Sequence, residues 1–244
     1  MPATRRILAT SGGFVRQPGL WDVLRPGRIM LEALRLSGVE RPRVLLVMTA
    51  TGDNDHYLSM MYSALSNAHC DVDHLALFTQ PNRRPAQAVG AADVVWVGGG
   101  SVANLLALWR LHGVDEAMSD AWERGAVLGG VSAGSICWHV GGTTDSFGAE
   151  LQPVVNGLAL LPYGNGVHYD SEEQRRPLLH SLVRDGVLPM SFATDDGVGI
   201  LYEGTEPVEV ISDRDDESSS AAYLVELSGG EVVESALPVG RITA

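Results

Sequence analysis

The sequence contains no lysine. All 17 basic residues are arginine, which excludes every mechanism that needs a lysine amine. Such mechanisms include a Schiff base with a carbonyl substrate, a phosphate-binding loop with its lysine, and a Ser-Lys dyad. Any catalysis by this chain must therefore use other side chains.

Cysteine is also scarce. Cys70 and Cys137 are too few for a disulfide framework in a chain of 244 residues. No apolar run has membrane-spanning length, and Arg5 and Arg6 lead directly into a strand-like segment rather than into a leader. We therefore expect a soluble, cytoplasmic protein.

Positive charge is in deficit. The formal net charge of −13 argues against nucleic acid or an anionic membrane as the partner, because both bind clustered positive charge. The motif H-E-x-x-H is absent, and the scattered cysteine and histidine residues lack zinc-ligand spacing, so we expect no metal and no cofactor. A small molecule or short peptide is the expected partner, and the protein is expected to be a monomer or a homodimer.

Short apolar runs alternate with amphipathic stretches along most of the chain. The length and the 45% hydrophobic content favour one large domain over residues 1–244. The order β-α-β-α-β, with polar loops after the runs, predicts an α/β fold with a parallel-core sheet flanked by helices. Strands are expected at 6–10, 43–50, 72–78, 93–97 and 126–131, and helices at 21–36, 56–68, 102–112, 133–140 and 172–184.

The second half of the chain has a different pattern. Residues 141–169 are rich in Gly, Pro and Asn without clear periodicity, which is typical of an irregular functional surface. From Met190 onward the chain is β-rich, and we expect antiparallel edge strands near 200–202, 208–211 and 223–227. The polar run 213–220 is predicted to be an exposed hairpin turn.

The segment 126–140, AVLGGVSAGSICWHV, has the residues of a nucleophile elbow. Residues 130–134 fit G-x-S-x-G, in which a tight strand-to-helix turn presents Ser132 above the sheet. The amide of Ala133, at the start of the helix, would point toward the oxygen of a substrate carbonyl. Small residues also gather where a helix packs tightly on a sheet, so the motif alone leaves tight packing as an alternative.

A second glycine-rich turn, VGGGS at 97–101, lies between an apolar strand and a helix. Its three glycines leave backbone amides unshielded beside a helix N-terminus, where they could supply a second oxyanion donor. A dinucleotide loop is disfavoured because G-x-G-x-x-G is absent. A purely structural turn stays the alternative.

A serine nucleophile needs a base, and seven histidines are available. Five lie within or at the ends of predicted helices or strands, and His139 points away from Ser132 if its helix is regular. His168, in the glycine-flanked loop YGNGVHYD, can reach over the strand ends. The loop acids in range to orient it are Asp145, Asp170, Asp195 and Asp196; the last two end a strand, and Asp145 is their rival.

These stretches resemble the serine peptidases of the peptidase E (aspartyl dipeptidase) and cyanophycinase group, which are similar to class I glutamine amidotransferase domains with serine in place of cysteine. The matching stretches are VGGGSVANLL (97–106), GGVSAGSICW (129–138), LALLPYGNGVHYD (158–170), EEQRR (172–176) and ATDDGVGI (193–200). The resemblance implies a three-layer, amidotransferase-like fold, nucleophile Ser132, base His168, acid Asp196, and an oxyanion hole from the amides near Gly99 and Ala133. Group members often carry glutamate at the position of Asp196, and Asp145 matches another position proposed for the acid.

We therefore hypothesise a serine exopeptidase that cleaves short peptides through an acyl-enzyme. An esterase or amidase with the same triad and a non-catalytic binding module are the alternatives. Because the net charge should repel an acidic substrate, an aspartyl dipeptide needs a local cation. The resemblance favours Arg175 as the residue that binds the side chain of an N-terminal aspartate. The alternative is that Arg175 and Arg176 pair with Glu172 and Glu173 on an exposed helix face.

Overall fold

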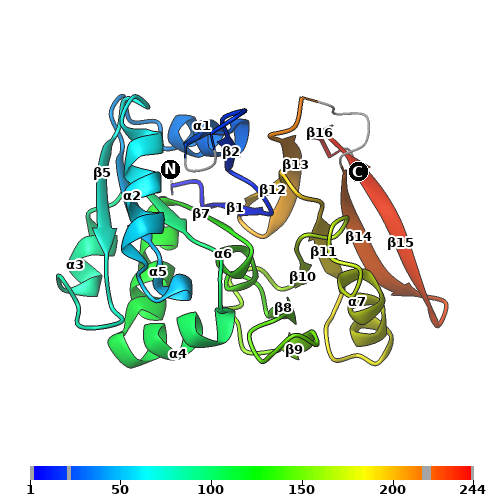
Figure 1. Ribbon diagram of the computed structural model, residues 1–244. Coiled ribbons are helices and arrows are strands. Elements are labelled where there is room, and N and C mark those ends of the chain that lie inside the picture. Colours follow the sequence, from blue (N-terminus) through cyan, green and yellow to red (C-terminus); the bar gives the residue numbers. More distant parts are fainter. Residues whose placement is uncertain (1–2, 21–22, 216–220, 243–244) are drawn as a thin grey trace.

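A large sheet forms the centre of the computed structural model, which describes residues 3–20, 23–215 and 221–242 (Figure 1). In spatial order its eight strands are β16 (Gly240–Arg241), β13 (Glu206–Ser212), β12 (Val198–Glu203), β1 (Arg6–Thr10), β7 (Val127–Val131), β6 (Val94–Val97), β4 (Arg43–Val47) and β5 (Asp71–Leu75). Strands β1, β7, β6, β4 and β5 are parallel, whereas β12, β13 and β16 extend the sheet with antiparallel pairs.

Helices cover both faces of this sheet because its central strands are apolar on both sides. In β4, Val44 and Leu46 belong to one hydrophobic cluster and Leu45 and Val47 to another, which is the period of two expected for a strand. The first cluster includes residues of α1 (Arg28–Leu36) and α2 (Asp55–Leu65). The second includes residues of α3 (Pro85–Gly90), α4 (Val102–His112) and α5 (Val114–Arg124). The result is a three-layer α/β arrangement.

A second sheet of six strands lies beside the first (Figure 1). Its order is β15 (Glu231–Pro238), β14 (Ala221–Ser228), β11 (Ser191–Thr194), β10 (Gly164–Gly166), β8 (Gly141–Thr144) and β9 (Gln152–Val154), and α7 (Arg175–Arg184) packs on it. Phe192 and Ala222 of this sheet share a hydrophobic cluster with Ile200 and Tyr202 of the first. A small hairpin, β2 (Phe14–Arg16) and β3 (Leu24–Pro26), forms a separate two-stranded sheet.

The predicted fold class is confirmed, with a parallel core, flanking helices and antiparallel C-terminal strands at the sheet edges. The second sheet was not anticipated. Residues 141–169, predicted to be irregular, contribute β8, β9 and β10 to it. Their Gly, Pro and Asn content conceals the pattern because these strands are short. The single domain over 1–244 stays a prediction.

Four predicted helices are shorter than expected: those at 56–68 and 172–184 are only slightly shorter, as α2 and α7, whereas those at 21–36 and 133–140 lose a turn or more. Residues 24–26 pair as β3, so the first helix begins only at Arg28, after Pro26 and Gly27. The helix after Ser132, α6, is limited to Ala133–Ile136. The carbonyls of residues 137, 138 and 139 accept hydrogen bonds from the amides of 158, 161 and 159. Tertiary hydrogen bonds therefore replace the helical ones.

The prediction of an exposed turn at 213–220 is wrong at its first residue. The Asp213 carboxylate accepts hydrogen bonds from the amides of Gly13, at 2.5 Å, and Ile29, at 2.9 Å. It therefore ties the start of α1 to the end of β13. Residues 216–220 lie outside the described part of the chain.

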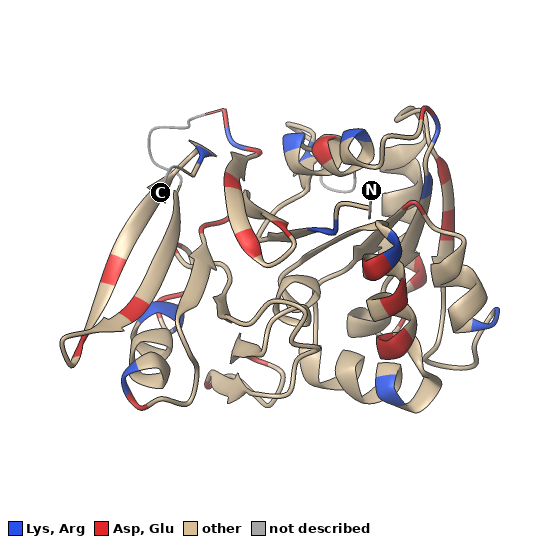
Figure 2. Ribbon diagram, turned by 180° about the vertical axis from the view of Figure 1, so that it is seen from behind, with Lys and Arg blue, Asp and Glu red and all other residues tan. Residues whose placement is uncertain are grey.

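Charged residues are interspersed over many elements (Figure 2). Arginine and acidic positions occur on helices and strands of both halves of the molecule rather than in blocks of one sign. Among the described residues, no helix is long and apolar enough to cross a membrane.

Candidate active site

Ser132 occupies a strained turn between β7 and α6. Its backbone angles, φ 57° and ψ −114°, lie in a region that non-glycine residues rarely adopt and that costs about 1–3 kcal/mol. The turn is possible because its neighbours are glycines. A Cβ atom at Gly130 would overlap the carbonyl of Gly134, and one at Gly134 would overlap the carbonyl of Val97. These contacts support the elbow that the G-x-S-x-G pattern predicts.

Gly99, in the turn between β6 and α4, lies against this serine. A Cβ atom at Gly99 would be 3.2 Å from Ser132 Cβ and 3.7 Å from its Oγ. The first hydrogen bonds within α6 are donated by the amides of Ser135 and Ile136 to the carbonyl of Ser132. The Ala133 amide comes before these donors in the chain, so the helix itself does not use it. The two glycine-rich turns are thus adjacent in space.

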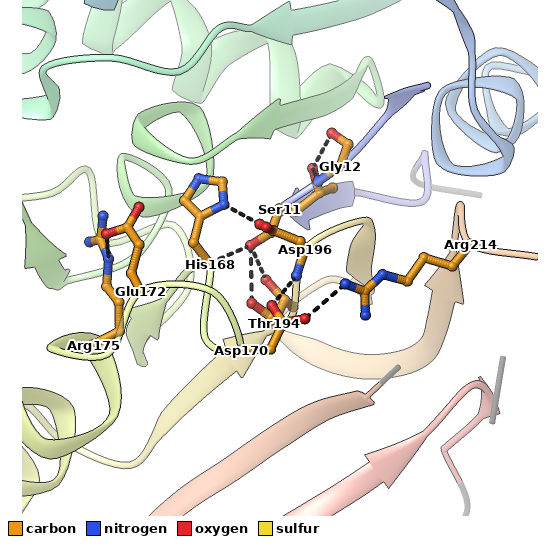
Figure 3. A network of polar contacts seen from close by, with 10 residues as sticks. Ser11, Gly12, His168, Asp170, Glu172, Arg175, Thr194, Asp196 and Arg214 are labelled. Carbon is orange, nitrogen blue, oxygen red and sulfur yellow. Dashed lines mark hydrogen bonds and ion pairs between the residues drawn. The ribbon is translucent and has the colours of Figure 1, made fainter. Parts of the chain in front are cut away.

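His168 makes a short hydrogen bond with Asp196. The distance from His168 Nδ1 to Asp196 Oδ1 is 2.5 Å, and this bond is the main cause that lowers the pKa of Asp196 below its ordinary value. His168 has a positive φ of 52°. Its backbone N–H donates to Ser11 Oγ at 3.0 Å, and Ser11 in turn bonds to Thr194 (Figure 3). The end of β1 therefore holds the histidine loop in place.

The loop with the acid is fixed from the other side. The Asp196 amide donates to Asp170 Oδ1 at 2.8 Å, and Arg214 pairs with Asp170 Oδ2 at 2.8 Å (Figure 3). Asp196 is the second residue after β11 and so lies close to the end of a core strand. Asp145 instead lines a cavity beside Glu172 and Glu173.

Ser132 and His168 meet at the same strand end, although no hydrogen bond joins their side chains among the described contacts. The Ser132 amide donates to the carbonyl of Thr10 at 3.0 Å, and the next residue, Ser11, accepts from His168. Catalytic hydrogen bonds are often long in the absence of substrate. The backbones of the serine and the histidine are thus bonded to two consecutive residues, Thr10 at the end of β1 and Ser11 after it.

Arg175 has internal partners rather than a solvent-facing position. Its side chain is 2% exposed, its Nε donates to Glu172 Oε2 at 2.8 Å, and its Nη1 donates to the carbonyl of Thr143. The alternative pairing of Arg175 with Glu172 is therefore present, but with the arginine buried. Sequence spacing could not reveal this burial because β8, which contributes Thr143, is remote in the chain.

Arg176 also has a different partner from Glu172 and Glu173, with which the sequence pattern paired it. It pairs with Glu234 in β15, and its guanidinium lies over the rings of Tyr169 and Tyr223 at 4.4 and 4.7 Å. His180 Nε2 bonds the same glutamate at 2.8 Å. Sequence reasoning missed Glu234 because it lies in an ordinary β-strand, 58 residues from Arg176, and no local pattern marks it.

The other notable histidine, His139, is fully buried at the end of the elbow segment. Burial lowers its pKa to about 4, so the ring is neutral near pH 7. Its Nδ1 bonds the carbonyl of Ser135 at 2.9 Å. Within the described residues, no group of three or more His, Cys, Asp or Glu side chains could hold a metal ion.

Three cavities border the loops of this site. One, of about 620 Å³, is acidic: Asp145, Glu172 and Glu173 line it together with Gly148, Ala149, Leu151 and Gln174. It adjoins the histidine loop, since the Glu172 amide donates to the carbonyl of His168 at 3.0 Å. A second cavity adjoins Ser11 and is lined in part by apolar side chains. A third shares Ser11, Gly12, Phe14 and Arg16 with the second, and its further lining residues are Val15, Asp196, Gly197, Asp213, Arg214 and Asp215.

Comparisons with known proteins identify the family of this chain. The profile of peptidase family S51 matches residues 9–210. An uncharacterized peptidase of Bacillus subtilis (strain 168), YgaJ, is 34% identical over 237 residues, which cover 96% of this chain and 98% of that protein. Peptidase E of Shewanella denitrificans is 28% identical over 163 residues, covering 62% of this chain and 66% of that protein.

Solved structures share the fold. A peptidase from an acI-B1 Actinobacterium superposes with a TM-score of 0.73 at 14% identity and covers 100% of this chain and 99% of its own. A putative peptidase E protein from Listeria monocytogenes EGD-e gives 0.62 at 16% identity, covering 86% of this chain and 99% of its own. The elbow serine, the histidine and the family match lead to one conclusion: this chain belongs to peptidase family S51 and is a serine-type peptidase, a hydrolase.

Proposed function

We propose that the protein is an exopeptidase that hydrolyses short peptides with Ser132 as the nucleophile, His168 as the base and Asp196 as the acid that orients the histidine. The observation that carries the proposal is the 2.5 Å bond between His168 and Asp196 at the strand end where Ser132 forms its elbow. In this arrangement Asp196 fixes the tautomer with the proton on Nδ1 and leaves Nε2 to accept a proton from the serine.

The reaction follows from these roles. His168 takes the hydroxyl proton as Ser132 Oγ bonds to the scissile carbonyl carbon, and the carbonyl π electrons move to its oxygen. The tetrahedral intermediate collapses, the C–N bond breaks, and His168 gives the proton to the leaving amine. Water then attacks the acyl-enzyme while His168 takes its proton, and the second collapse returns that proton to Ser132.

The oxyanion would be stabilised by amides near Gly99 and Ala133. The 3.7 Å approach of the Gly99 position to Ser132 Oγ supports this assignment, because donors must lie close to where negative charge develops. Removal of one such donor typically costs about 10²–10³ in rate.

A more specific hypothesis is that this exopeptidase prefers peptides with an N-terminal aspartate. Arg175 would bind that carboxylate only by exchanging Glu172, which already holds its guanidinium. The acidic cavity beside His168 complements a cation instead, and the free α-amino group that every dipeptide carries is one. Comparison of Asp-Leu, Ala-Leu and N-acetyl-Ala-Leu separates these substrate hypotheses: recognition of aspartate requires Asp-Leu to be fastest, whereas recognition of the amine requires only that the acetylated peptide be poor.

Turnover of a dipeptide library tests the function, with the Ser132→Ala protein as the blank. A fluorophosphonate probe should label the wild type and not this variant. Labelling with hydrolysis of simple esters but no dipeptide would favour the esterase alternative. Neither labelling nor turnover would favour a binding module.

A further inference from the structure

The second cavity, of about 430 Å³, opens between the β2–β3 hairpin and α2. We call it the hairpin cavity. Its apolar walls are Phe14 and Leu24 from the hairpin, Met60 from α2, and Val131 from the end of β7. The other lining residues are Ser11, Gly12, Arg16, His56 and Tyr57.

Three lining residues place the hairpin cavity directly beside the candidate active site. Ser11 accepts the hydrogen bond from the His168 amide, and Figure 3 shows Ser11 and Gly12 next to that histidine. Val131 precedes Ser132 in the chain. Tyr57, which also lines the cavity, lies beside the oxyanion turn. A Cβ atom at Gly98, the residue before Gly99, would be 3.5 Å from the Tyr57 ring. The cavity therefore adjoins the base, the nucleophile and the oxyanion turn together.

The charges that face this cavity differ from those of the acidic cavity. Among its described lining residues there is no carboxylate, whereas Arg16, which it shares with the cavity beside Asp196, Asp213 and Asp215, contributes a positive charge. Tyr57 lines the same cavity, and the charge of Arg16 opposes the rise in the pKa of Tyr57 that burial causes. A dipeptide has a positive amino end and a negative carboxyl end. The acidic cavity matches the first of these ends, and Arg16 of the hairpin cavity matches the second.

The apolar wall is also preformed. Phe14 packs edge-on against Trp96 with ring centroids 5.7 Å apart, and Trp96 is buried in the core. A rigid apolar surface binds an apolar side chain with little loss of conformational entropy.

We propose that the hairpin cavity is the subsite for the leaving residue of a dipeptide substrate, with an apolar side chain against Phe14, Leu24 and Met60 and the terminal carboxylate toward Arg16. The inference rests on the proposed peptidase function and adds the class of substrate: dipeptides with a large apolar C-terminal residue and a free carboxylate. The amino end then lies toward the acidic cavity.

Substitution of Met60 tests the apolar part. Wild-type kcat/KM should be about 10- to 100-fold higher for Ala-Phe than for Ala-Gly. Met60→Trp fills the cavity and should lower kcat/KM for Ala-Phe at least tenfold while that for Ala-Gly changes by less than about twofold. Ser59→Trp, on the exposed face of the same helix, is the matched control and should leave both substrates unchanged. Equal rates for Ala-Phe and Ala-Gly, or parallel losses in Met60→Trp, would overturn the proposal.

Substitution of Arg16 tests the carboxylate part. The wild type should cleave Ala-Phe about 10- to 100-fold better than Ala-Phe amide, and Arg16→Gln should narrow that ratio. Arg25→Gln, on the partner strand of the hairpin and outside the cavity lining, should leave the ratio unchanged. Equal turnover of the acid and the amide by the wild type would overturn the role of the carboxylate.

Binding to the Ser132→Ala protein separates the subsite from catalysis. Calorimetry should give a Kd for Ala-Phe at least tenfold below that for Ala-Gly, and Met60→Trp in the same background should abolish the difference. Such binding without turnover by the wild type would support the subsite and contradict the peptidase proposal. Turnover of both dipeptides with equal binding would support the peptidase and overturn the subsite.

Discussion

At the scale of single residues, substitution of Ser132 should change activity and stability in different ways. Ser132→Ala should lower kcat about 10⁴- to 10⁶-fold, the usual effect of removing a triad nucleophile. Its far-ultraviolet circular dichroism should match the wild type, because alanine accepts the same elbow with one hydroxyl fewer. Residual activity above a few per cent would contradict the covalent mechanism.

Glycine at the same position should behave differently from alanine. Ser132 has φ 57°, which glycine adopts without a steric penalty, so Ser132→Gly should be about 1 kcal/mol more stable than Ser132→Ala. Urea unfolding of the two inactive variants measures this difference. If Ser132→Gly is no more stable than Ser132→Ala, the backbone at position 132 is not strained.

The acid that orients His168 can be identified by comparing two aspartates. Asp196→Ala should lower kcat far more than Asp145→Ala, because Asp196 is 2.5 Å from His168 Nδ1 while Asp145 lines the acidic cavity. Loss of a triad acid that sets the tautomer costs up to about 10⁴ in kcat. A larger loss in Asp145→Ala would assign the acid to Asp145.

The pH dependence of stability tests the same bond without a substrate. The folded-state pKa of Asp196 is lowered from 3.8, mainly by the hydrogen bond to His168. Its contribution is therefore present above pH 3.8 and is lost as the pH falls through the lower folded value. Asp196→Asn should lower Tm at pH 6, and its deficit should shrink below about pH 3.8. Asp145→Asn is the control, and the same pattern in both variants would point to a general acid effect.

At the scale of elements, α7 is attached to the β14–β15 hairpin by a shared carboxylate. Glu234 accepts from Tyr169, Arg176 and His180. Glu234→Gln should destabilise the protein by about 1.5–3 kcal/mol, the effect of a lost charged hydrogen bond. Chemical denaturation measures the change. Glu231→Gln, at an exposed position of the same strand, should change stability by less than about 0.5 kcal/mol, and an equal loss there would show that the shared carboxylate is not responsible.

At the scale of the whole molecule, the two sheets share part of their core, so we expect them to unfold together. Phe192 of β11 packs on Tyr163 and Tyr202 at ring-centroid distances of 5.0 and 5.9 Å. Phe192→Ala should cost about 3–5 kcal/mol and lower the Tm of both sheets equally. Hydrogen exchange of β6 reports on the first sheet, and hydrogen exchange of β14 reports on the second. Separate transitions would indicate two domains rather than the single one predicted.

The sequence by itself determined the features that depend on neighbouring residues. The alternation of apolar and amphipathic runs was enough for the α/β class, because periodicity reflects which faces are buried. The glycines around Ser132 were enough to predict a tight turn from β7 to α6, because only small residues allow such a turn. The helix at 102–112 was predicted with the bounds of α4.

Tertiary structure alone decided what depends on contacts between remote segments. The helix after Ser132 ends at Ile136 because the amides of residues 158, 159 and 161 bond the carbonyls that would have continued it. Arg175 is buried because β8 provides a carbonyl from Thr143, and Arg176 turns to Glu234 in β15. The hairpin cavity combines residues of β2, β3, α2 and β7. Local pattern shows which side chains a segment can bury, but their partners are set by packing between segments distant in the chain.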